Sequence, residues 1–297
     1  MIIELNLKKV KNMITLFTDT SANLSNELTE KYNIKIIPFG YSVNGQDVSY
    51  KDLIDFDGKK FYDSMRNGAD IKTSMINISL IKEALEKELK TGNDIIYITM
   101  SGGISGTAHS AFLAAEELRE EYPERKIAVI DSLAASLGEG LQVIRAAKHL
   151  NSGANFEEIL TLCEKMRKNI CQYFTVDDLE YLKRGGRVSR LASAVGTVLK
   201  IKPVLRGDNE GKIVMCAKIR GRKNALSSLA DYYEEICIDK TSDIGIAHAD
   251  DEEDAVHLLE ILKERGFKGN CLTVCYEPVT GAHVGPGTVA LFFFKNI

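Results

Sequence analysis

The first half of the chain alternates between strand-like and helix-like patterns of hydrophobic residues. An apolar-rich run at 13–17 is followed by a polar turn and then by a helix-like stretch at 24–31, which together open an α/β unit. The same order recurs, with strand-like runs at 34–38, 94–99 and 127–130 and helix-like patterns at 61–67, 78–89, 108–121, 134–150 and 156–168. This alternation predicts parallel strands joined by crossover helices.

The pattern changes near residue 170. A strand-like run at 172–176 precedes a basic segment that contains glycines, and two more strand-like runs flank an Asp-Asn-Glu-Gly turn. The later elements are strands at 201–205, 212–219, 243–249, 271–276 and 289–294 and helices at 222–237 and 252–265. We therefore predict an α/β protein of two domains, a parallel-sheet α/β domain at 13–168 and an α+β domain at 169–297.

The composition is that of an ordinary globular protein. The 297 residues exceed the usual size of one hydrophobic core, which favours about two domains. With 44% hydrophobic and 27% charged residues, the chain is neither disordered nor fibrous. Its apolar runs fall short of the roughly 18 residues that a membrane-spanning helix needs, and residues 1–12 lack the apolar core of a signal peptide. We expect a cytoplasmic protein without stable membrane insertion. We also interpret Met13 as a plausible true start of the protein.

The sequence offers no motif for a metal or a nucleotide. The six cysteines form no C-x-x-C pair and have no histidine at ligand spacing, so we expect buried free thiols in a reducing compartment. The acidic run at 250–254 after His248 fits the first turn of a helix, whose dipole favours negative charge. A Walker A motif and a full G-x-G-x-x-G are both missing from the sequence. We predict no metal and no cofactor.

Positive charge is concentrated in one segment. The chain has a net charge of −4, but residues 183–223 contain twelve Lys and Arg against Asp208 and Glu210. The glycines in 183–190 indicate a shaped turn that presents guanidinium groups. Such a segment can bind phosphate, an acidic protein surface or nucleic acid. Nucleic acid is disfavoured, because the chain is acidic overall and the turn has no aromatic residue for stacking.

A small-residue segment at 101–107 is the first candidate ligand site. It lies between a predicted strand end and a predicted helix start, where ligands bind in open α/β sheets. Its hydroxyl groups and unpaired backbone N–H groups favour an anion. Simple helix capping by Ser105 or Thr107 is the alternative interpretation.

Two other segments carry hydroxyl or imidazole groups. Thr73 and Ser74 precede a helix-like stretch, where capping is the more common role. His283 stands among glycines and a proline at 281–287, which predicts a loop that holds one imidazole at a cleft. A histidine without a ligand role remains the alternative for this loop.

A serine hydrolase is the competing enzymatic interpretation. Ser105, Asp131 or Asp177, and His283 follow the chain order of an α/β-hydrolase triad. Thr107, however, stands where the nucleophile elbow has its second glycine. Hydrolysis of acyl esters is therefore kept as the alternative function.

Several short motifs together resemble those of the DegV family of bacterial fatty-acid-binding proteins, which includes the FakB-type subunits of fatty acid kinase. The resemblance extends from about Met13 to Ile297 and rests on motifs in the family's order. These motifs lie at 17–24, 72–74, 104–107, 131–132, 138–140, 182–187, 202–205 and 281–287.

The resemblance implies a lipid-binding protein rather than an enzyme. A long-chain fatty acid would lie in an apolar tunnel between the two domains. A separate ATP-dependent kinase subunit would convert its carboxylate to acyl phosphate, a step in phospholipid metabolism. The chain would need no catalytic residue, metal or cofactor of its own.

The resemblance also implies roles for individual residues. Thr73, Ser105 and His283 would hydrogen-bond the carboxylate, with Ser74 and Gly106 beside them. Arg184 and Arg187 would handle phosphate or dock the kinase, and the sequence does not separate these two roles.

Overall fold

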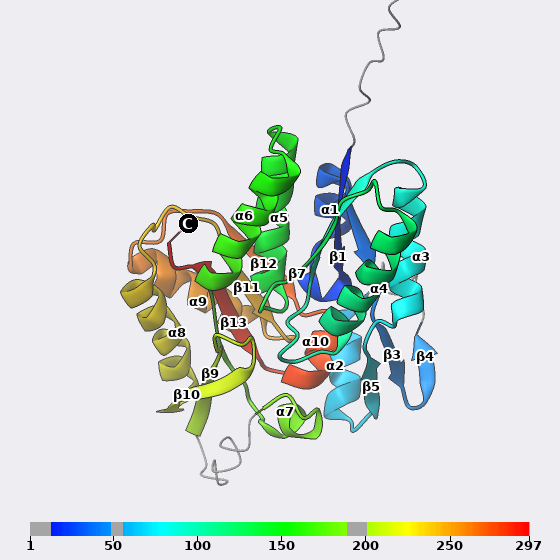
Figure 1. Ribbon diagram of the computed structural model, residues 1–297. Helices are drawn as coiled ribbons and strands as arrows, with labels where there is room; N and C mark the ends of the chain where they lie inside the picture. The colour runs from blue at the N-terminus through cyan, green and yellow to red at the C-terminus, as the bar shows by residue number, and fades with distance from the viewer. Residues whose placement is uncertain (1–12, 49–55, 189–200, 297) are drawn as a thin grey trace, which may run out of the picture.

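The computed structural model describes residues 13–48, 56–188 and 201–296 and arranges them around two main β-sheets (Figure 1). The predicted extension at 1–12 and the part of the basic segment at 189–200 lie outside the described residues. The first sheet is parallel, in the order β2 (Ile34–Ile37), β1 (Ile14–Asp19), β6 (Asp94–Thr99) and β7 (Ile127–Asp131). These are the four strands that the sequence pattern predicts.

Helices cover both faces of the first sheet, as crossover connections require. Two helices pack together on one face and three others gather on the opposite side (Figure 1). The first pair is α3 (Ile78–Leu89) and α4 (Thr107–Glu121), and the second group is α1 (Asn26–Tyr32), α5 (Leu137–Asn151) and α6 (Phe156–Asn169). Within the described part of the chain, no helix combines the length and the apolar character needed to cross a membrane.

The helix boundaries follow local chemistry. α6 begins at a capping box, in which Asn155 and Glu158 each satisfy a backbone N–H of the other. The sequence pattern predicted the start of α5 at 134, but this helix begins at Leu137. Leu133 and Ser136 have φ angles of 54° and 51°, which a right-handed helix cannot contain.

The second sheet is mixed. Its order is β10 (Ile213–Arg220), β9 (Ile201–Gly207), β8 (Ile170–Thr175), β13 (Val289–Phe294), β11 (Ile244–His248) and β12 (Cys271–Cys275). β11 and β12 are parallel and the other neighbours are antiparallel. Two helices, α8 (Arg222–Ile236) and α9 (Glu252–Glu264), pack against this sheet and against each other.

Helix α5 joins the two halves of the molecule. It contacts β1 and β6 of the first sheet and β8, β11 and β13 of the second. One buried cluster accordingly extends from Leu16 and Ile96 to Phe174 and Phe292. The predicted boundary near residue 168 lies where the chain passes from α6 to β8, but the division into two domains stays a prediction because this core is continuous.

Several short elements escaped the sequence pattern. A three-stranded antiparallel sheet has the order β4 (Gln46–Val48), β3 (Gly40–Val43) and β5 (Ile71–Ser74), and it lies beside α2 (Gly58–Arg66). The others are η1 (Thr20–Ala22), α7 (Glu180–Arg184) and α10 (Pro278–Val284). Short elements leave too few residues for a periodic pattern to emerge.

Two local predictions were wrong. Thr73 and Ser74 do not cap a helix, because they end strand β5 and the N-cap of α3 is Asn77. His283 is not in a loop but in the last turn of α10. Gly281 looked like a loop residue, yet it lies inside this helix, where a Cβ atom would collide with the Tyr62 hydroxyl.

A buried cluster of carboxyl groups fixes the start of α5 against β1. Asp19 accepts hydrogen bonds from the Thr99 hydroxyl at 2.7 Å and the Met100 N–H at 3.1 Å. The Ser21 hydroxyl contacts both Asp19 and Glu139, the latter at 2.7 Å. One hydroxyl proton can serve only one carboxylate, so the other carboxyl group must donate to Ser21 and carry a proton. Burial accordingly raises the pKa of Asp19 and that of Glu139.

Candidate functional site

A mostly apolar cavity lies between the first sheet and the second. It contains about 800 Å³ of empty space, part of it open to solvent. Its lining comes from β5, the loops that follow β6 and β7, strands β8, β9, β10 and β13 of the second sheet, and α7 and α10. The larger apolar lining residues are Phe39, Met75, Met100, Ile104, Phe174, Leu182, Ile213, Tyr276, Val279, Val284 and Phe292. A concave site with a mostly apolar lining and a few polar groups is typical of a small-molecule site.

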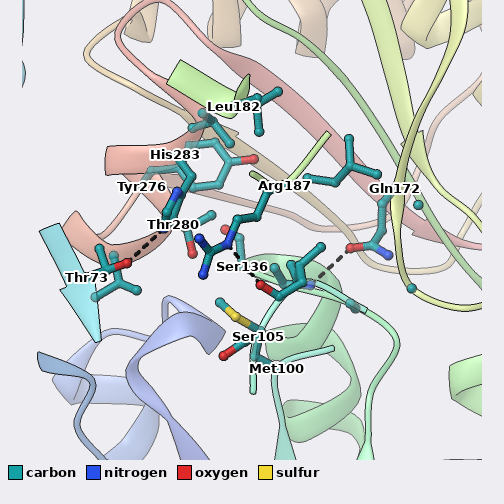
Figure 2. Close-up of a pocket in the computed structure, with 18 of the residues that line it drawn as sticks. Thr73, Met100, Ser105, Ser136, Gln172, Leu182, Arg187, Tyr276, Thr280 and His283 are labelled. Atoms are coloured by element: carbon teal, nitrogen blue, oxygen red, sulfur yellow. Dashed lines mark hydrogen bonds between the residues drawn. The ribbon is translucent and has the colours of Figure 1, made fainter. Parts of the chain in front are cut away.

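Among the polar residues that line this cavity, four come from distant parts of the chain: Thr73, Ser105, Arg187 and His283 (Figure 2). The Thr73 hydroxyl and His283 Nε2 are 2.8 Å apart and share a hydrogen bond. Arg187 Nε donates to the Ile104 carbonyl at 3.1 Å, and the guanidinium also contacts the Gly185 carbonyl. The fold therefore places Thr73, Ser105 and His283, the three predicted carboxylate-binding residues, along one cavity together with the positively charged Arg187.

Arg187 is half-buried and faces an apolar space. Within the described part of the chain it has no acidic partner, since its recorded hydrogen bonds go to two carbonyl oxygens. Burial lowers its pKa from the ordinary value, although a guanidinium stays charged. A cation in this position favours an anionic ligand group.

His283 is neutral at physiological pH in this environment. Burial, followed by the nearby positive charge of Arg187, lowers the pKa of its imidazole from 6.5 to about 4. A neutral imidazole provides one donor and one acceptor nitrogen. Gly185 lies so close to this ring that a Cβ atom there would collide with Nδ1, which explains a glycine in the basic turn.

Three of the four polar residues also face a second, outer hollow. Thr73, Arg187 and His283 line it together with Tyr181 and Arg184, and it holds about 950 Å³ of empty space that includes open solvent. The Arg184 guanidinium stacks on the Tyr181 ring, 4.8 Å from its centre. Arg184 and Arg187, which the sequence treated as a pair, thus occupy different positions: Arg187 lines both spaces and Arg184 lines the outer hollow.

The other predicted site residues have smaller parts in the cavity. Ser74 lines it, but Gly106 does not. Gly106 is the N-cap of α4 and lies against Met75, whose sulfur a Cβ atom at 106 would meet at 2.5 Å. The Ser105 hydroxyl accepts from the Thr107 N–H at 3.2 Å, but the N-cap of α4 is Gly106 and no side chain caps this helix, so the alternative of capping by Ser105 or Thr107 was wrong.

Sequence reasoning missed the lining residues of the second sheet. Gln172 and Phe174 project from β8 and Phe292 from β13. Alternation along β8 places residues 172 and 174 on one face, but it does not show that this face borders a cavity rather than a packed core.

The arrangement does not form a hydrolase triad. His283 is hydrogen-bonded to Thr73, while the Ser105 hydroxyl contacts the Thr107 hydroxyl at 3.1 Å. Asp131 accepts from backbone N–H groups, and Asp177 pairs with Lys202 at 2.7 Å. A triad needs serine, histidine and acid in one hydrogen-bonded chain, which these residues do not make. Among the described residues, no group of three potential metal ligands is found either.

Comparisons with known proteins agree on one family. The model of the DegV family, described as uncharacterised proteins, matches residues 13–296. A DegV domain-containing protein of Clostridium perfringens is 38% identical over 284 residues, covering 95% of this chain and 97% of the relative. One from Streptococcus pyogenes is 33% identical over 278 residues, covering 94% and 96%.

Solved structures support the same conclusion. A DegV family protein from Thermus thermophilus, described by its fatty acid binding, has a TM-score of 0.86 at 28% identity, covering 95% of this chain and 99% of that one. DegV from Bacillus subtilis, described as a fatty acid binding protein, has a TM-score of 0.81 at 32% identity, covering 96% and 100%. The predicted fold class, a parallel-sheet α/β part followed by a second sheet, is confirmed.

Proposed function

This chain belongs to the DegV family, and on that premise we propose that it binds one long-chain fatty acid in the cavity between the two sheets. The observation that carries the proposal is Arg187, a half-buried cation that faces an apolar space without an acidic partner among the described residues. A fatty acid fits both features, because its carboxylate can pair with Arg187 and its alkyl chain can fill the apolar part of the cavity. Solved relatives from T. thermophilus and B. subtilis are described as fatty acid binding proteins, which supports the same ligand class.

The energetics favour this ligand. An acyl chain of about sixteen carbons, at about 0.8 kcal/mol per buried CH₂, contributes on the order of 10 kcal/mol before ordering costs. A buried carboxylate costs several kcal/mol unless it is paired and hydrogen-bonded. The Arg187 guanidinium and the hydroxyls of Thr73 and Ser105 provide these partners without a metal.

Mass spectrometry of the purified protein tests the proposal. The full chain would be purified natively without added lipid and then denatured, and the released small molecules would be identified. We expect a long-chain fatty acid at about one equivalent, or its stoichiometric uptake when it is added. A protein that neither carries nor takes up fatty acid would overturn the proposal.

Ligand binding should raise the pKa of His283. The ring is neutral in the free protein because burial and Arg187 lower its pKa to about 4. A bound carboxylate offsets the Arg187 charge and favours the imidazolium, so the pKa moves upward, toward 6.5. Affinity should then increase as the pH falls through the pKa of His283 in the bound state toward its lower pKa in the free protein, because in this range the bound protein holds more protons than the free one.

Proton NMR of the histidine ring, recorded over pH 4–7 with and without fatty acid, measures this shift. An unchanged titration of His283 in the saturated protein would contradict a carboxylate beside Arg187.

We also propose that the outer hollow is the face through which an ATP-dependent kinase subunit reaches the carboxylate. Thr73, Arg187 and His283 border both spaces, so a carboxylate that they hold lies at the boundary between cavity and surface. Arg184 is exposed in this hollow and is available to an incoming phosphate or to an acidic surface of the kinase.

Reversing the charge of Arg184 should separate binding from phosphorylation. R184E is expected to change fatty acid affinity by less than about threefold, because this residue does not line the inner cavity, but to lower acyl-phosphate formation by at least about tenfold. The assay would combine the protein with the fatty acid kinase subunit and ATP. K165E on α6, well away from α7 (Figure 1), is the matched charge reversal and should leave the rate unchanged. Equal rates for R184E and the wild type would rule out this role for Arg184.

A further inference from the structure

One polar side chain closes the cavity at the end opposite the carboxylate-binding groups. Gln172 on β8 lies across the pocket from Thr73 (Figure 2). Gln172 and Gly207 also line a separate hollow on the other side, which holds about 1120 Å³ of empty space including open solvent. The Gln172 side chain is therefore a partition between two spaces.

The Gln172 amide is fixed at both of its polar atoms. Its Oε1 accepts from the Ala135 N–H at 3.1 Å, and its Nε2 donates to the Leu133 carbonyl at 2.9 Å. Both partners belong to the loop after β7, whose residues 133 and 136 have positive φ angles. These bonds connect the second sheet to the first and hold the side chain across the opening between the two spaces.

Gly207 provides the room that this arrangement needs. A Cβ atom at 207 would lie 2.7 Å from Nε2 of Gln172, so any larger residue would displace the amide. The φ angle of Gly207 is not in the left-handed region. Close packing against Gln172, rather than backbone conformation, is therefore what favours glycine at this position.

The two spaces differ in chemistry. The inner cavity is apolar around Phe174 and Phe292, whereas the separate hollow beyond Gln172 is lined by four basic side chains together with Asp208. Those four are Arg167, Lys168, Arg206 and Lys295. An alkyl chain gains free energy in the first space and little in the second, so the position of the partition determines how much chain the protein can bury.

We propose that Gln172, supported by Gly207, is the specificity-determining residue that sets the longest acyl chain this protein accepts. The inference rests on the proposed fatty acid function and adds a length limit to it. The chain runs from Thr73 and Arg187 toward Gln172, and its methyl end stops at the side chain of that residue.

Affinity measurements over a series of saturated fatty acids test this inference. Chains of about 12 to about 22 carbons would compete with a fluorescent fatty acid for the full-length protein, and affinity should rise about fourfold per added methylene until the cavity is full. Q172A should move this limit to longer chains by about two carbons and increase affinity about tenfold for the first chain that the wild type rejects. Q172M has nearly the same volume without the hydrogen bonds, so it should keep the wild-type limit.

The outcomes separate this inference from the proposed function. Wild-type protein that binds no fatty acid of any length would refute the proposed function itself. The partition would be overturned if Q172A has the same chain-length limit as the wild type. It would also be overturned if Q172M shifts the limit as far as Q172A does. If Q172A does not fold, as judged by thermal unfolding, G207A carries the test: its added methyl group displaces the Gln172 amide, so the limit should move away from the wild-type length, and an unchanged limit would overturn the inference.

Discussion

Replacing Arg187 with alanine is expected to weaken fatty acid binding by about 2–4 kcal/mol, or about 30- to 1000-fold. The variant removes the cation that faces the apolar cavity and leaves the ligand carboxylate with hydroxyl groups and a neutral imidazole. A buried charge whose partner is lost keeps its desolvation cost, which is why the expected effect is large. Competition with a fluorescent fatty acid, analysed as the ratio of dissociation constants, gives the magnitude.

Two further variants show whether this effect is specific. R184A removes a neighbouring arginine that lines the outer hollow, and its affinity should stay within about threefold of the wild type. R187K keeps the positive charge but loses the planar guanidinium group that can bind a carboxylate through two hydrogen bonds. It should therefore bind fatty acid more tightly than R187A but more weakly than the wild type. Equal effects of R187A and R184A would argue for a diffuse field rather than a direct contact, and full affinity in R187A would remove the carboxylate from this end of the cavity.

Replacing Asp19 with alanine is expected to destabilise the protein by about 3–5 kcal/mol. Asp19 is fully buried and accepts from the hydroxyls of Ser21 and Thr99 and from the N–H groups of Ser21 and Met100. Its removal leaves several buried donors without an acceptor, and each unsatisfied group costs about 1–3 kcal/mol. Urea denaturation of the ligand-free protein measures the change in free energy of unfolding.

The neighbouring Glu139 provides a matched comparison. E139Q supplies an amide donor to the Ser21 hydroxyl and an oxygen acceptor for Thr18, so the hydrogen bonds of the cluster remain possible. The pKa of Glu139 is raised in the folded protein. The wild type therefore loses stability as the pH rises from the pKa of Glu139 in the unfolded chain toward its higher pKa in the folded protein. E139Q should therefore be at least as stable as the wild type at pH 8, whereas D19A should not. A loss below about 1 kcal/mol in D19A would show that water replaces the missing acceptor.

This cluster gives a structural role to two motifs. Residues 17–24 and 138–140 were part of the family resemblance, which implied no site residue in either of them. In the structure, Asp19, Ser21 and Glu139 bond to one another beneath the start of α5. Gly140 allows that helix to approach η1, because a Cβ atom there would collide with the Ala22 carbonyl. These residues hold the first sheet against α5 and do not line the apolar cavity.

Much of the architecture could be predicted from the sequence. The strands of the first sheet and the long helices appear in the hydrophobic pattern because a buried face repeats with the period of its element. β6 and α3 were predicted with the same bounds that the structure has. The family motifs also identified Thr73, Ser105 and His283 as candidate residues for binding the carboxylate.

The sequence by itself thus determined the main elements, their order and the residue types available for binding an anion. Only the tertiary structure decided that Thr73 and His283, which are 210 residues apart, share a hydrogen bond. It also decided that Arg187 faces the cavity while Arg184 faces outward, and that Gln172 closes the far end. The reason is physical: periodicity records which face of an element is buried, whereas a site depends on contacts between elements whose separation along the chain leaves no local pattern.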